Sequence, residues 1–338
     1  MATFWRYVLE RLIICVATVA ISVTVVFFAP RMVPGDPLGA ITIKLAQMGG
    51  NRGADALIAA YKIRFGLDKS MGEQYVAYLR QLAQGDLGYS ISSFPSTVGD
   101  LLAQAIPWTI GLMLVTTLIS WTLGSILGGL VGWTGARSPA LQALVPVALV
   151  LYTIPYYILA IVLSFLLAYV FPLLPRTGAF TLGTQPTLTL GFALDVAQHA
   201  ALPALSIVLV SLGWWFLSMR SLVVSIKGED FMTWAEAKGL PRPRIFWGYA
   251  FRNALLPQAT GLALSLGHII GGQLVTETIF GYPGLGYLIF NSIKSLDFPV
   301  IQGSILLIIL SVAIINFVMD LVYPLIDPRI RYGAAGRA

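Results

Sequence analysis

Charged side chains are scarce in this chain. Asp, Glu, Lys and Arg make up 11% of its 338 residues, whereas a soluble domain carries about 25%. Apolar residues of the set AVILMFWYC make up 57%, and the mean hydropathy is +0.81. This composition excludes an ordinary soluble enzyme and predicts a membrane protein.

Residues that ligate metals or form disulfides are scarce as well. The chain has one cysteine, Cys15, and two histidines, His199 and His268. One cysteine permits neither an internal disulfide nor a zinc site built on several cysteines. The sequence also lacks the Gly-x-x-x-x-Gly-Lys-Ser/Thr phosphate loop and the His-Glu-x-x-His motif. We therefore expect no metal or cofactor on this chain and no enzymatic activity.

Long uncharged runs are present instead. A spanning helix needs roughly 20 mostly apolar residues, and the runs found here are continuously apolar, without the alternation of a barrel strand. We predict an all-α integral membrane protein with six transmembrane helices. The runs are 12–30, 101–136, 138–175, 196–219, 253–276 and 298–319.

The first run has an alternative interpretation as a secretory signal peptide. Such peptides have apolar regions of about 7–15 residues before a cleavage site of small residues. The run 12–30 is longer and ends in Ala29-Pro30-Arg31, which is a poor cleavage context. A transmembrane helix is the better interpretation.

The Lys and Arg residues are unevenly distributed between the connecting segments. If the N-terminus is inside, the short outer loops hold Arg176 and Lys294 alone, while the long segment 31–100 is largely exempt from the positive-inside bias. We predict that both termini are cytoplasmic. The net charge of +6 then reflects orientation and does not require a nucleic-acid partner. The inner residues are Arg6, Arg11, Arg137, Arg220, Lys227, Lys238, Arg242, Arg244, Arg252, Arg329, Arg331 and Arg337.

Two polar segments interrupt the apolar runs. The outer segment, about 31–100, is too long for a simple connection, so we expect a small folded cap on the outer face. The inner segment, about 220–252, contains a helix start at Glu229-Asp230 and a helix stop at Gly239 followed by two prolines.

The short helix of the inner segment is predicted to be amphipathic. Phe231, Trp234 and Ala235 follow i, i+3, i+4 spacing and therefore share one face. Such a helix can dock into a groove on another protein, or it can lie on the bilayer surface. The spacing alone leaves both possibilities open.

The inner segment carries a family resemblance. Residues 220–257 resemble the cytoplasmic loop of permease subunits in ATP-binding-cassette (ABC) importers, in the dipeptide/oligopeptide/nickel branch. The Glu-Ala-Ala-x-x-x-Gly pattern of that family falls on Thr233, Trp234, Ala235 and Gly239, so Thr and Trp replace its first two residues. The branch's Ala-Lys-Gly, which ends at Gly239, and its Arg-Asn-Ala, which starts at Arg252, are intact.

Further motifs of this branch occur in order along the chain. The long outer segment resembles that of the branch's B-type subunit. The matching strings are Val33-Pro34-Gly35-Asp36-Pro37, Phe65-Gly66-Leu67-Asp68, Gly85-Asp86-Leu87-Gly88-Tyr89-Ser90, Thr276-Glu277-Thr278-Ile279-Phe280, Tyr282-Pro283-Gly284-Leu285-Gly286 and Asp327-Pro328-Arg329-Ile330.

The resemblance implies a division of labour between subunits. Residues 1–338 would form one permease domain in a prokaryotic inner membrane and supply half of a translocation pathway. Its partners would be a second homologous permease, two ATPases that carry ATP and Mg, and an outer substrate-binding protein. Short peptides are the expected cargo. The alternative is an oligosaccharide or another small solute, because the polar residues of the spans are neutral hydrogen-bonding groups, which suit an uncharged substrate.

The resemblance also implies a coupling role for the inner loop. Its helix would dock in a groove of an ATPase, with Trp234 as the anchor and charged residues at the rim. Gly239 would end the helix in a conformation that a Cβ makes costly. The coupling candidates are Phe231, Trp234, Ala235, Glu236, Ala237, Lys238 and Gly239.

Polar residues in the last two spans are candidates for the substrate pathway, because polar side chains are costly in a membrane. His268 has helix packing as its alternative role. Glu277 precedes a Gly/Pro-rich turn, so it is either an outer gate or a solvated helix end. An ion-driven secondary transporter is the remote alternative, although no Asp or Glu falls inside a run. The candidates are Gln258, His268, Gln273, Glu277 and Asn316.

Small residues and prolines predict how the spans pack. Gly124, Gly128 and Gly132 form consecutive Gly-x-x-x-Gly spacings, which permit close contact between helices. Pro146, Pro155 and Pro203 lie inside the runs, where a proline is expected to kink the helix.

Overall fold

The computed structural model describes residues 2–35, 37–39, 42, 54–267, 269–271 and 273–326. Over these residues the chain is helical, and the one β-pairing is an isolated bridge between Tyr89 and Thr97. The predicted all-α membrane fold is confirmed. The motif at Asp327–Ile330 and the candidate His268 lie outside the described residues. The described chain forms two compact units, Met1–Pro107 with Gly284–Ala338 and Trp108–Pro283.

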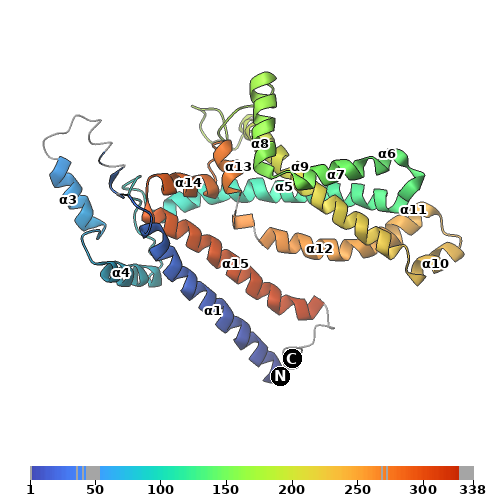
Figure 1. Cartoon of the computed structure of the whole chain (residues 1–338), viewed down its shortest axis with the longest axis horizontal. Coiled ribbons are helices and arrows are strands. Elements are labelled where there is room, and N and C mark those ends of the chain that lie inside the picture. Colours follow the sequence, from blue (N-terminus) through green and yellow to red (C-terminus); the bar gives the residue numbers. More distant parts are fainter. Residues whose placement is uncertain are drawn as a thin grey trace. The chain divides into compact units, whose positions relative to one another are not determined.

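The first unit contains the first and last helices of the chain, which lie side by side (Figure 1). These are α1 (Ala2–Arg31) and α15 (Phe298–Ile326). They are antiparallel, because the Tyr7 hydroxyl donates to the carbonyl of Asp320 at 3.0 Å, while Gln302 donates to the carbonyl of Phe27, near the C-terminal end of α1, at 3.4 Å. The first and last helices of the chain therefore pack against each other within the first unit.

The outer segment adds two described helices to this unit, α3 (Ala54–Arg64) and α4 (Met71–Ala83). A capping box starts α4, since Ser70 and Glu73 bond reciprocally to each other's backbone N–H groups. The hydroxyl groups of Tyr75 and Thr24 lie 2.8 Å apart, which places α4 against the C-terminal part of α1. The outer segment is thus folded over its described part and is attached to the first span.

A buried carboxylate fixes the loop that follows α4. Asp297 lies between α14 (Leu285–Lys294) and α15 and is fully buried. It accepts hydrogen bonds from the Ser90 hydroxyl at 2.5 Å, the Ile91 N–H at 3.1 Å, and the N–H and hydroxyl of Ser92 at 2.9 and 2.7 Å. These bonds compensate the cost of burying the charge and join two segments far apart in sequence.

The second unit is organised by the crossing of α5 (Val98–Thr134), which begins in the first unit, and α9 (Leu190–Ile226). Gly124, Gly128 and Gly132 of α5 lie at the crossing. A Cβ at Gly128 would overlap the backbone of Phe216. The packing role predicted for these glycines is confirmed by this close approach.

Replacing Gly128 with alanine is therefore expected to destabilise the protein by about 1–3 kcal/mol, the usual cost of overpacking. The backbone of α9 has to move away from the added methyl group. The higher helix propensity of alanine does not compensate the free-energy cost of that movement. Gly111→Ala is the matched control, because it lies on the same helix and its Cβ would meet nothing within 4 Å. Thermal unfolding in detergent compares the two variants. Equal stability would contradict the packing role.

The third apolar run is broken by a sharp bend. The helices on either side, Pro139–Thr153 and Tyr156–Val170, meet at 99°. Pro155 lies at the break, and Ile154 before it has an extended backbone. A residue preceding a proline is disfavoured in the helical region, which explains the bend. After η1 (Gly135–Arg137), which precedes the run, the pieces are α6 (Pro139–Gln142), α7 (Leu144–Thr153), α8 (Tyr156–Ser164) and the π-helix η2 (Phe165–Val170).

The fifth apolar run is also interrupted. It is covered by α12 (Arg252–Gly267), η4 (Ile269–Gly271) and α13 (Leu274–Ile279). Among the described residues, four helices are each long and apolar enough to span a membrane, or up to five spans if the bent pair counts as one. The number of six spans and the cytoplasmic position of both termini stay predictions.

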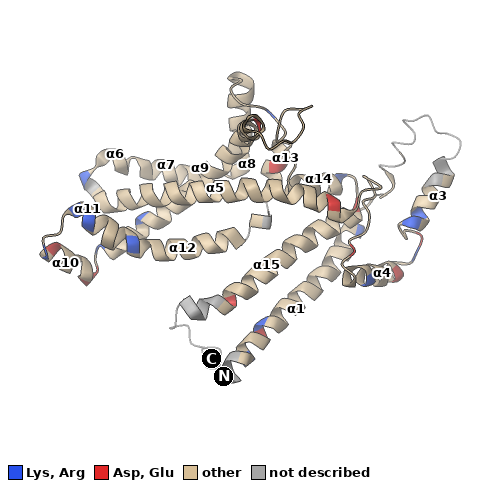
Figure 2. Ribbon diagram, turned by 180° about the vertical axis from the view of Figure 1, so that it is seen from behind, with Lys and Arg blue, Asp and Glu red and all other residues tan. Residues whose placement is uncertain are grey.

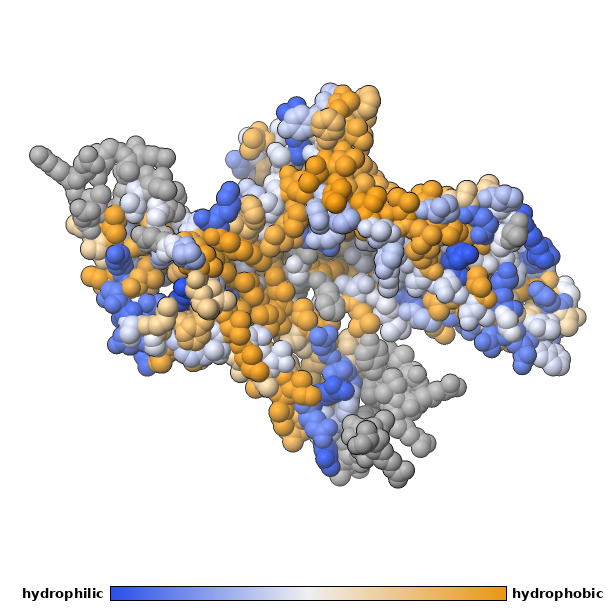
Figure 3. Space-filling model, in the orientation of Figure 1, coloured by the Kyte–Doolittle hydropathy of each residue, from blue (hydrophilic) through white to orange (hydrophobic). Residues whose placement is uncertain are grey.

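Charge and hydropathy follow this helical arrangement. The long stretches of α5, α9 and α12 carry few charged residues, while Lys and Arg gather around α11 and the start of α12 (Figure 2). The surface over α7 and α8 is largely apolar (Figure 3). Its exposed residues include Tyr152, Ile158, Ile161 and Phe165, as expected for helices that face lipid.

Candidate functional site

The inner loop connects α9 to α12 and folds into three short helices. They are α10 (Asp230–Ala237), α11 (Arg242–Ile245) and the π-helix η3 (Phe246–Phe251). The helix expected after Glu229-Asp230 is present as α10, with Lys238 at its C-cap. We call residues 220–252 the inner loop.

The helix α10 has a buried side and an exposed side. Met232 and Ala235 are 3% and 2% exposed, and they belong to a core cluster with Phe246. Trp234 is 69% exposed and Phe231 is 38% exposed. The face expected to contain Phe231, Trp234 and Ala235 is therefore divided, because Ala235 packs against the chain itself. The exposed side chains of Phe231 and Trp234 are the apolar groups of α10 that another molecule can contact.

A lysine fastens the start of the inner loop to α5. The Lys227 Nζ donates to the carbonyls of Trp133 at 3.0 Å and Gly132 at 3.4 Å, and it lies 5.6 Å from the centre of the Trp133 ring. Partial burial, followed by repulsion from Arg137, lowers the pKa of Lys227. Because Trp133 also packs against the core of the loop, α10 is held to the C-terminal end of α5.

Gly239 ends α10 in the left-handed conformation, as the sequence predicts. Its φ is +71°, and its N–H donates to the carbonyl of Glu236 at 2.9 Å. A Cβ built at this position would meet nothing within 4 Å. A side chain here is therefore disfavoured by the backbone conformation and would project into open space, where a partner can be placed.

The remaining coupling candidates are exposed. Glu236, Ala237 and Lys238 lie at the end of α10, and Arg242 and Arg244 follow on α11. Figure 2 shows this end of the second unit carrying both signs of charge. Exposed charges around an aromatic anchor are the usual arrangement of a protein-binding surface, where the rim steers association.

Gln258 is buried among three helices. Its side-chain amide donates to the carbonyl of Trp215 on α9 at 3.5 Å, and its backbone carbonyl accepts from the indole of Trp121 on α5 at 3.2 Å. Its side-chain oxygen is buried and has no partner among the described residues. In this conformation Gln258 links helices, and it keeps one acceptor free inside the unit.

Glu277 is also buried. It lies on α13, is 0% exposed, and accepts a hydrogen bond from the Thr109 hydroxyl at 2.7 Å. Its backbone carbonyl accepts from the N–H of Tyr282 at 2.8 Å. Burial, followed by the nearby Glu277, raises the pKa of Tyr282 to about 12. The alternative of Glu277 as a solvated helix end is therefore wrong for this conformation, and its role as a gate stays a prediction.

The other pathway candidates do not gather at one place. Gln273 is the half-buried N-cap residue of α13. Asn316 is exposed on α15, in the other unit. His268 lies outside the described residues. Within the second unit, the structure brings buried polar side chains to α12 and α13 without forming a single described cluster of all the candidates.

Three residues that hold the candidate residues or their helices in place were not identified from the sequence. Met232 carries the buried face of α10, and its spacing of three from Ala235 was the available signal. Lys227 was read as an orientation charge, although it also fixes the loop. Thr109, the partner of Glu277, is one of five threonines in the run 101–136, and nothing in the sequence singled it out. Among the described residues, no group of three His, Cys, Asp or Glu could hold a metal ion.

Comparison with known proteins gives the family. Residues 124–332 match the family model described as the binding-protein-dependent transport system inner membrane component. The di/tripeptide transport system permease protein DppB of Pseudomonas aeruginosa (strain UCBPP-PA14) is 32% identical, covering 92% of this chain and 94% of that protein. The probable D,D-dipeptide transport system permease protein DdpB of Escherichia coli (strain K12) is 32% identical, covering 98% and 99%.

A third relative agrees with these two. The dipeptide transport system permease protein DppB of Escherichia coli (strain K12) is 31% identical, covering 97% of this chain and 99% of that protein. The similarity thus extends over nearly the whole length of each protein, including the outer segment and the inner loop. The chain therefore belongs to the family of binding-protein-dependent transport system inner membrane components, which are multi-pass permease subunits of ABC transporter complexes.

Proposed function

We propose that the chain is a permease subunit of an ATP-driven importer of short peptides. It supplies half of the translocation pathway and is itself not an enzyme. The observation that carries the proposal is full-length similarity to relatives that are named as di/tripeptide, D,D-dipeptide and dipeptide permeases. The same names favour peptides over the oligosaccharide alternative.

The partners in this proposal are the other subunits that an ABC importer requires. A second homologous permease completes the pathway, two ATPases bind ATP and Mg in the cytoplasm, and an outer binding protein delivers the peptide. The inner loop docks on an ATPase through Trp234 and Phe231. This assignment is supported by an exposed aromatic pair on a helix whose opposite side is fixed to the protein by Met232 and Ala235.

The coupling step is mechanical. When the ATPases close, the force on α10 passes through its buried side to α11, η3 and the end of α5, because these elements share one core cluster and the Lys227 contacts. The helix α12 continues from η3 and carries Gln258, whose bonds reach α5 and α9. A displacement of the loop can therefore change the packing of the helices that line the pathway.

Uptake by sealed, right-side-out membrane vesicles tests the proposal. Vesicles that contain the chain and its co-purifying subunits, supplied with the binding protein, are expected to accumulate a labelled dipeptide when ATP is present on the ATPase side. Uptake should stop with a non-hydrolysable ATP analogue and should persist after an ionophore collapses the ion gradients. Uptake that requires an ion gradient and ignores ATP would contradict the proposal, and preference for a labelled oligosaccharide would reassign the cargo.

A further inference from the structure

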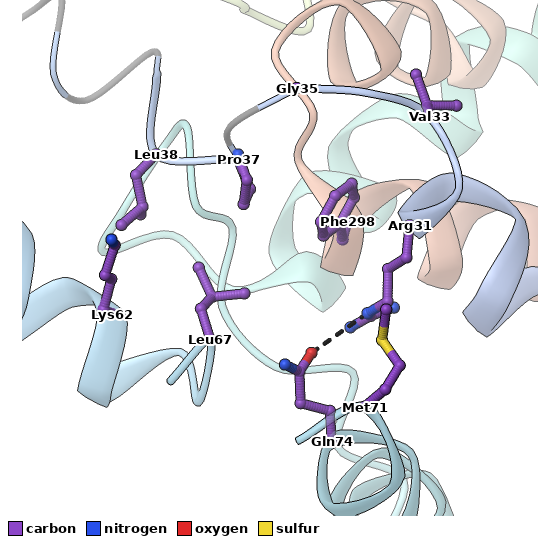
Figure 4. Close-up of a pocket in the computed structure, with 10 residues that line it drawn as sticks. All are labelled: Arg31, Val33, Gly35, Pro37, Leu38, Lys62, Leu67, Met71, Gln74 and Phe298. Atoms are coloured by element: carbon purple, nitrogen blue, oxygen red, sulfur yellow. Dashed lines mark hydrogen bonds between the residues drawn. The ribbon is translucent and has the colours of Figure 1, made fainter. Parts of the chain in front are cut away.

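A pocket of about 460 Å³ lies in the outer part of the first unit. Its walls are one side of α4, the turn after α3, the loop before Ser90 and the first residues of α15. Arg31, at the outer end of α1, lines this pocket and also a smaller neighbouring pocket of about 230 Å³. Figure 4 shows the smaller pocket, in which the Arg31 side chain extends from α1 towards Gln74.

Arg31 is a half-buried cation whose bonds leave donors available. Its Nη1 donates to the carbonyl of Phe27 at 2.8 Å, and its Nε donates to the Gln74 side chain at 3.3 Å. Its guanidinium carbon lies 3.8 Å from the centre of the Phe27 ring. No carboxylate of a described residue lies within 4.0 Å of it. A guanidinium has five N–H donors, so it can bind a further acceptor.

Tyr78 also lines this pocket. Its hydroxyl is buried and has no hydrogen-bond partner in the part of the chain that the structure describes. Burial raises the pKa of Tyr78, with a smaller opposing effect of Arg31, so the hydroxyl stays protonated at neutral pH. A buried hydroxyl without a partner is costly, and a ligand oxygen in the pocket would remove that cost.

The rest of the lining is positively charged on balance. Arg64 and Lys69 line the pocket, and Asp86 is its acidic residue. The Asp86 carboxylate is held by the N–H of Gly88 at 2.8 Å. An excess of cations, with an unpartnered O–H group beside a guanidinium, is complementary to a carboxylate or phosphate group.

The position of α4 indicates that the pocket opens towards water. Gln74, Ala77 and Tyr78 lie on the pocket side of α4. Val76 and Leu79 are exposed, and at about 100° per residue they lie on the other side of the helix. Because Tyr75 bonds Thr24 within the first span, this apolar side suits contact with the bilayer interface. The opposite, pocket-bearing side is then accessible to a soluble molecule.

We propose that this pocket binds the carboxylate or phosphate group of a small anion on the outer side of the membrane. Arg31 and the Tyr78 hydroxyl anchor the oxyanion, and Arg64 and Lys69 attract it. The carboxylate can come from a soluble short peptide and the phosphate from the headgroup of an anionic lipid. The inference does not rest on the proposed transport function, because the pocket is contained in the first unit and its test measures binding alone.

Binding to the full-length chain, with the subunits that co-purify with it, tests this proposal in nanodiscs of phosphatidylcholine. The probes are dialanine and its C-terminal amide, measured by calorimetric titration. Dialanine is expected to bind saturably and its amide at least tenfold more weakly, since a hydrogen bond to a charged group is lost along with the charge. Tyr78→Phe is expected to weaken dialanine binding about tenfold.

Tyr75→Phe is the matched control, because it makes the same change three residues away on α4 and its hydroxyl bonds Thr24 instead of lining the pocket. It should leave affinity unchanged. Thermal unfolding separates a structural role from a binding role: Tyr78→Phe should be as stable as the unchanged protein, or more stable, since it removes an unpartnered hydroxyl.

A second series of measurements, in nanodiscs that contain an anionic lipid, identifies the source of the anion. If it is a headgroup, nanodiscs with phosphatidylglycerol should compete with dialanine and raise the unfolding temperature of the unchanged protein but not of Tyr78→Phe. Equal affinities of Tyr78→Phe and Tyr75→Phe, or of dialanine and its amide, would overturn the proposal. So would the lack of saturable binding by both dialanine and the anionic lipid.

Discussion

Gly239→Asp is expected to abolish ATP-driven uptake while the protein still inserts and folds. A residue other than glycine in the left-handed conformation costs roughly 1–2 kcal/mol, and Gly239 has φ +71° at the end of α10. A Cβ added at this position meets nothing within 4 Å of its own chain, so the large effect is expected at the surface that a partner would occupy. Loss of a central contact of about 2 kcal/mol corresponds to roughly thirtyfold weaker binding.

The control for this variant is Gly183→Asp. Gly183 also has a positive φ, +91°, and also has open space around its Cβ position, but it lies outside the inner loop. The two variants therefore share backbone strain and added charge and differ in location. Uptake of labelled dipeptide, normalised to the amount of chain in the membrane, is the measurement. Equal transport by both variants would disprove the coupling role of Gly239.

Asp297→Ala is expected to loosen the outer segment by about 3 kcal/mol. The change leaves the hydroxyls of Ser90 and Ser92 and the N–H groups of Ile91 and Ser92 without their acceptor. Ser90 and Ile91 are buried whereas Ser92 is half-buried, and each unsatisfied buried group costs about 1–3 kcal/mol. Hydrogen exchange measures the effect locally. Protection of the Ile91 and Ser92 amides should fall by roughly a hundredfold.

Asp100→Ala serves as the control for Asp297. The Asp100 carboxylate is exposed and accepts from the Thr97 hydroxyl at 2.6 Å, so its removal should cost well under about 1 kcal/mol. Asp297→Asn should lie between the two, because it keeps one acceptor oxygen and turns a donor towards the N–H groups. A protection loss of similar size in Asp100→Ala and Asp297→Ala would show that Asp297 does not fix this loop.

The sequence predicted the helices well where local signals agree. The start at Glu229-Asp230 and the glycine at 239 bound α10 to within a residue, because caps and left-handed glycines act locally. It failed to predict which face of α10 is buried. Ala235 lies against Phe246, and that contact depends on how α11 and η3 fold back, which helical spacing alone does not contain.

Long-range polar contacts were the least predictable part. Asp297 and Ser90 are separated by most of the chain, and neither stands in a motif that signals the other. Thr109 and Glu277 meet for the same reason, through tertiary packing of α5 against α13. The break at Pro155 was predicted as a kink, but its size of 99° depends on what the two pieces pack against.

The most direct test of the proposed function is co-purification of the tagged chain from its native membranes in mild detergent, followed by mass spectrometry. We expect recovery of a second, homologous permease and of ABC ATPases, with the ATPases lost when Trp234 is replaced by alanine and the second permease retained. Trp234 is the most exposed aromatic residue of α10, so this loss would locate the contact. Recovery of the chain alone or as a homo-oligomer, with ion-driven uptake intact, would contradict its role as a subunit of an ATP-driven importer.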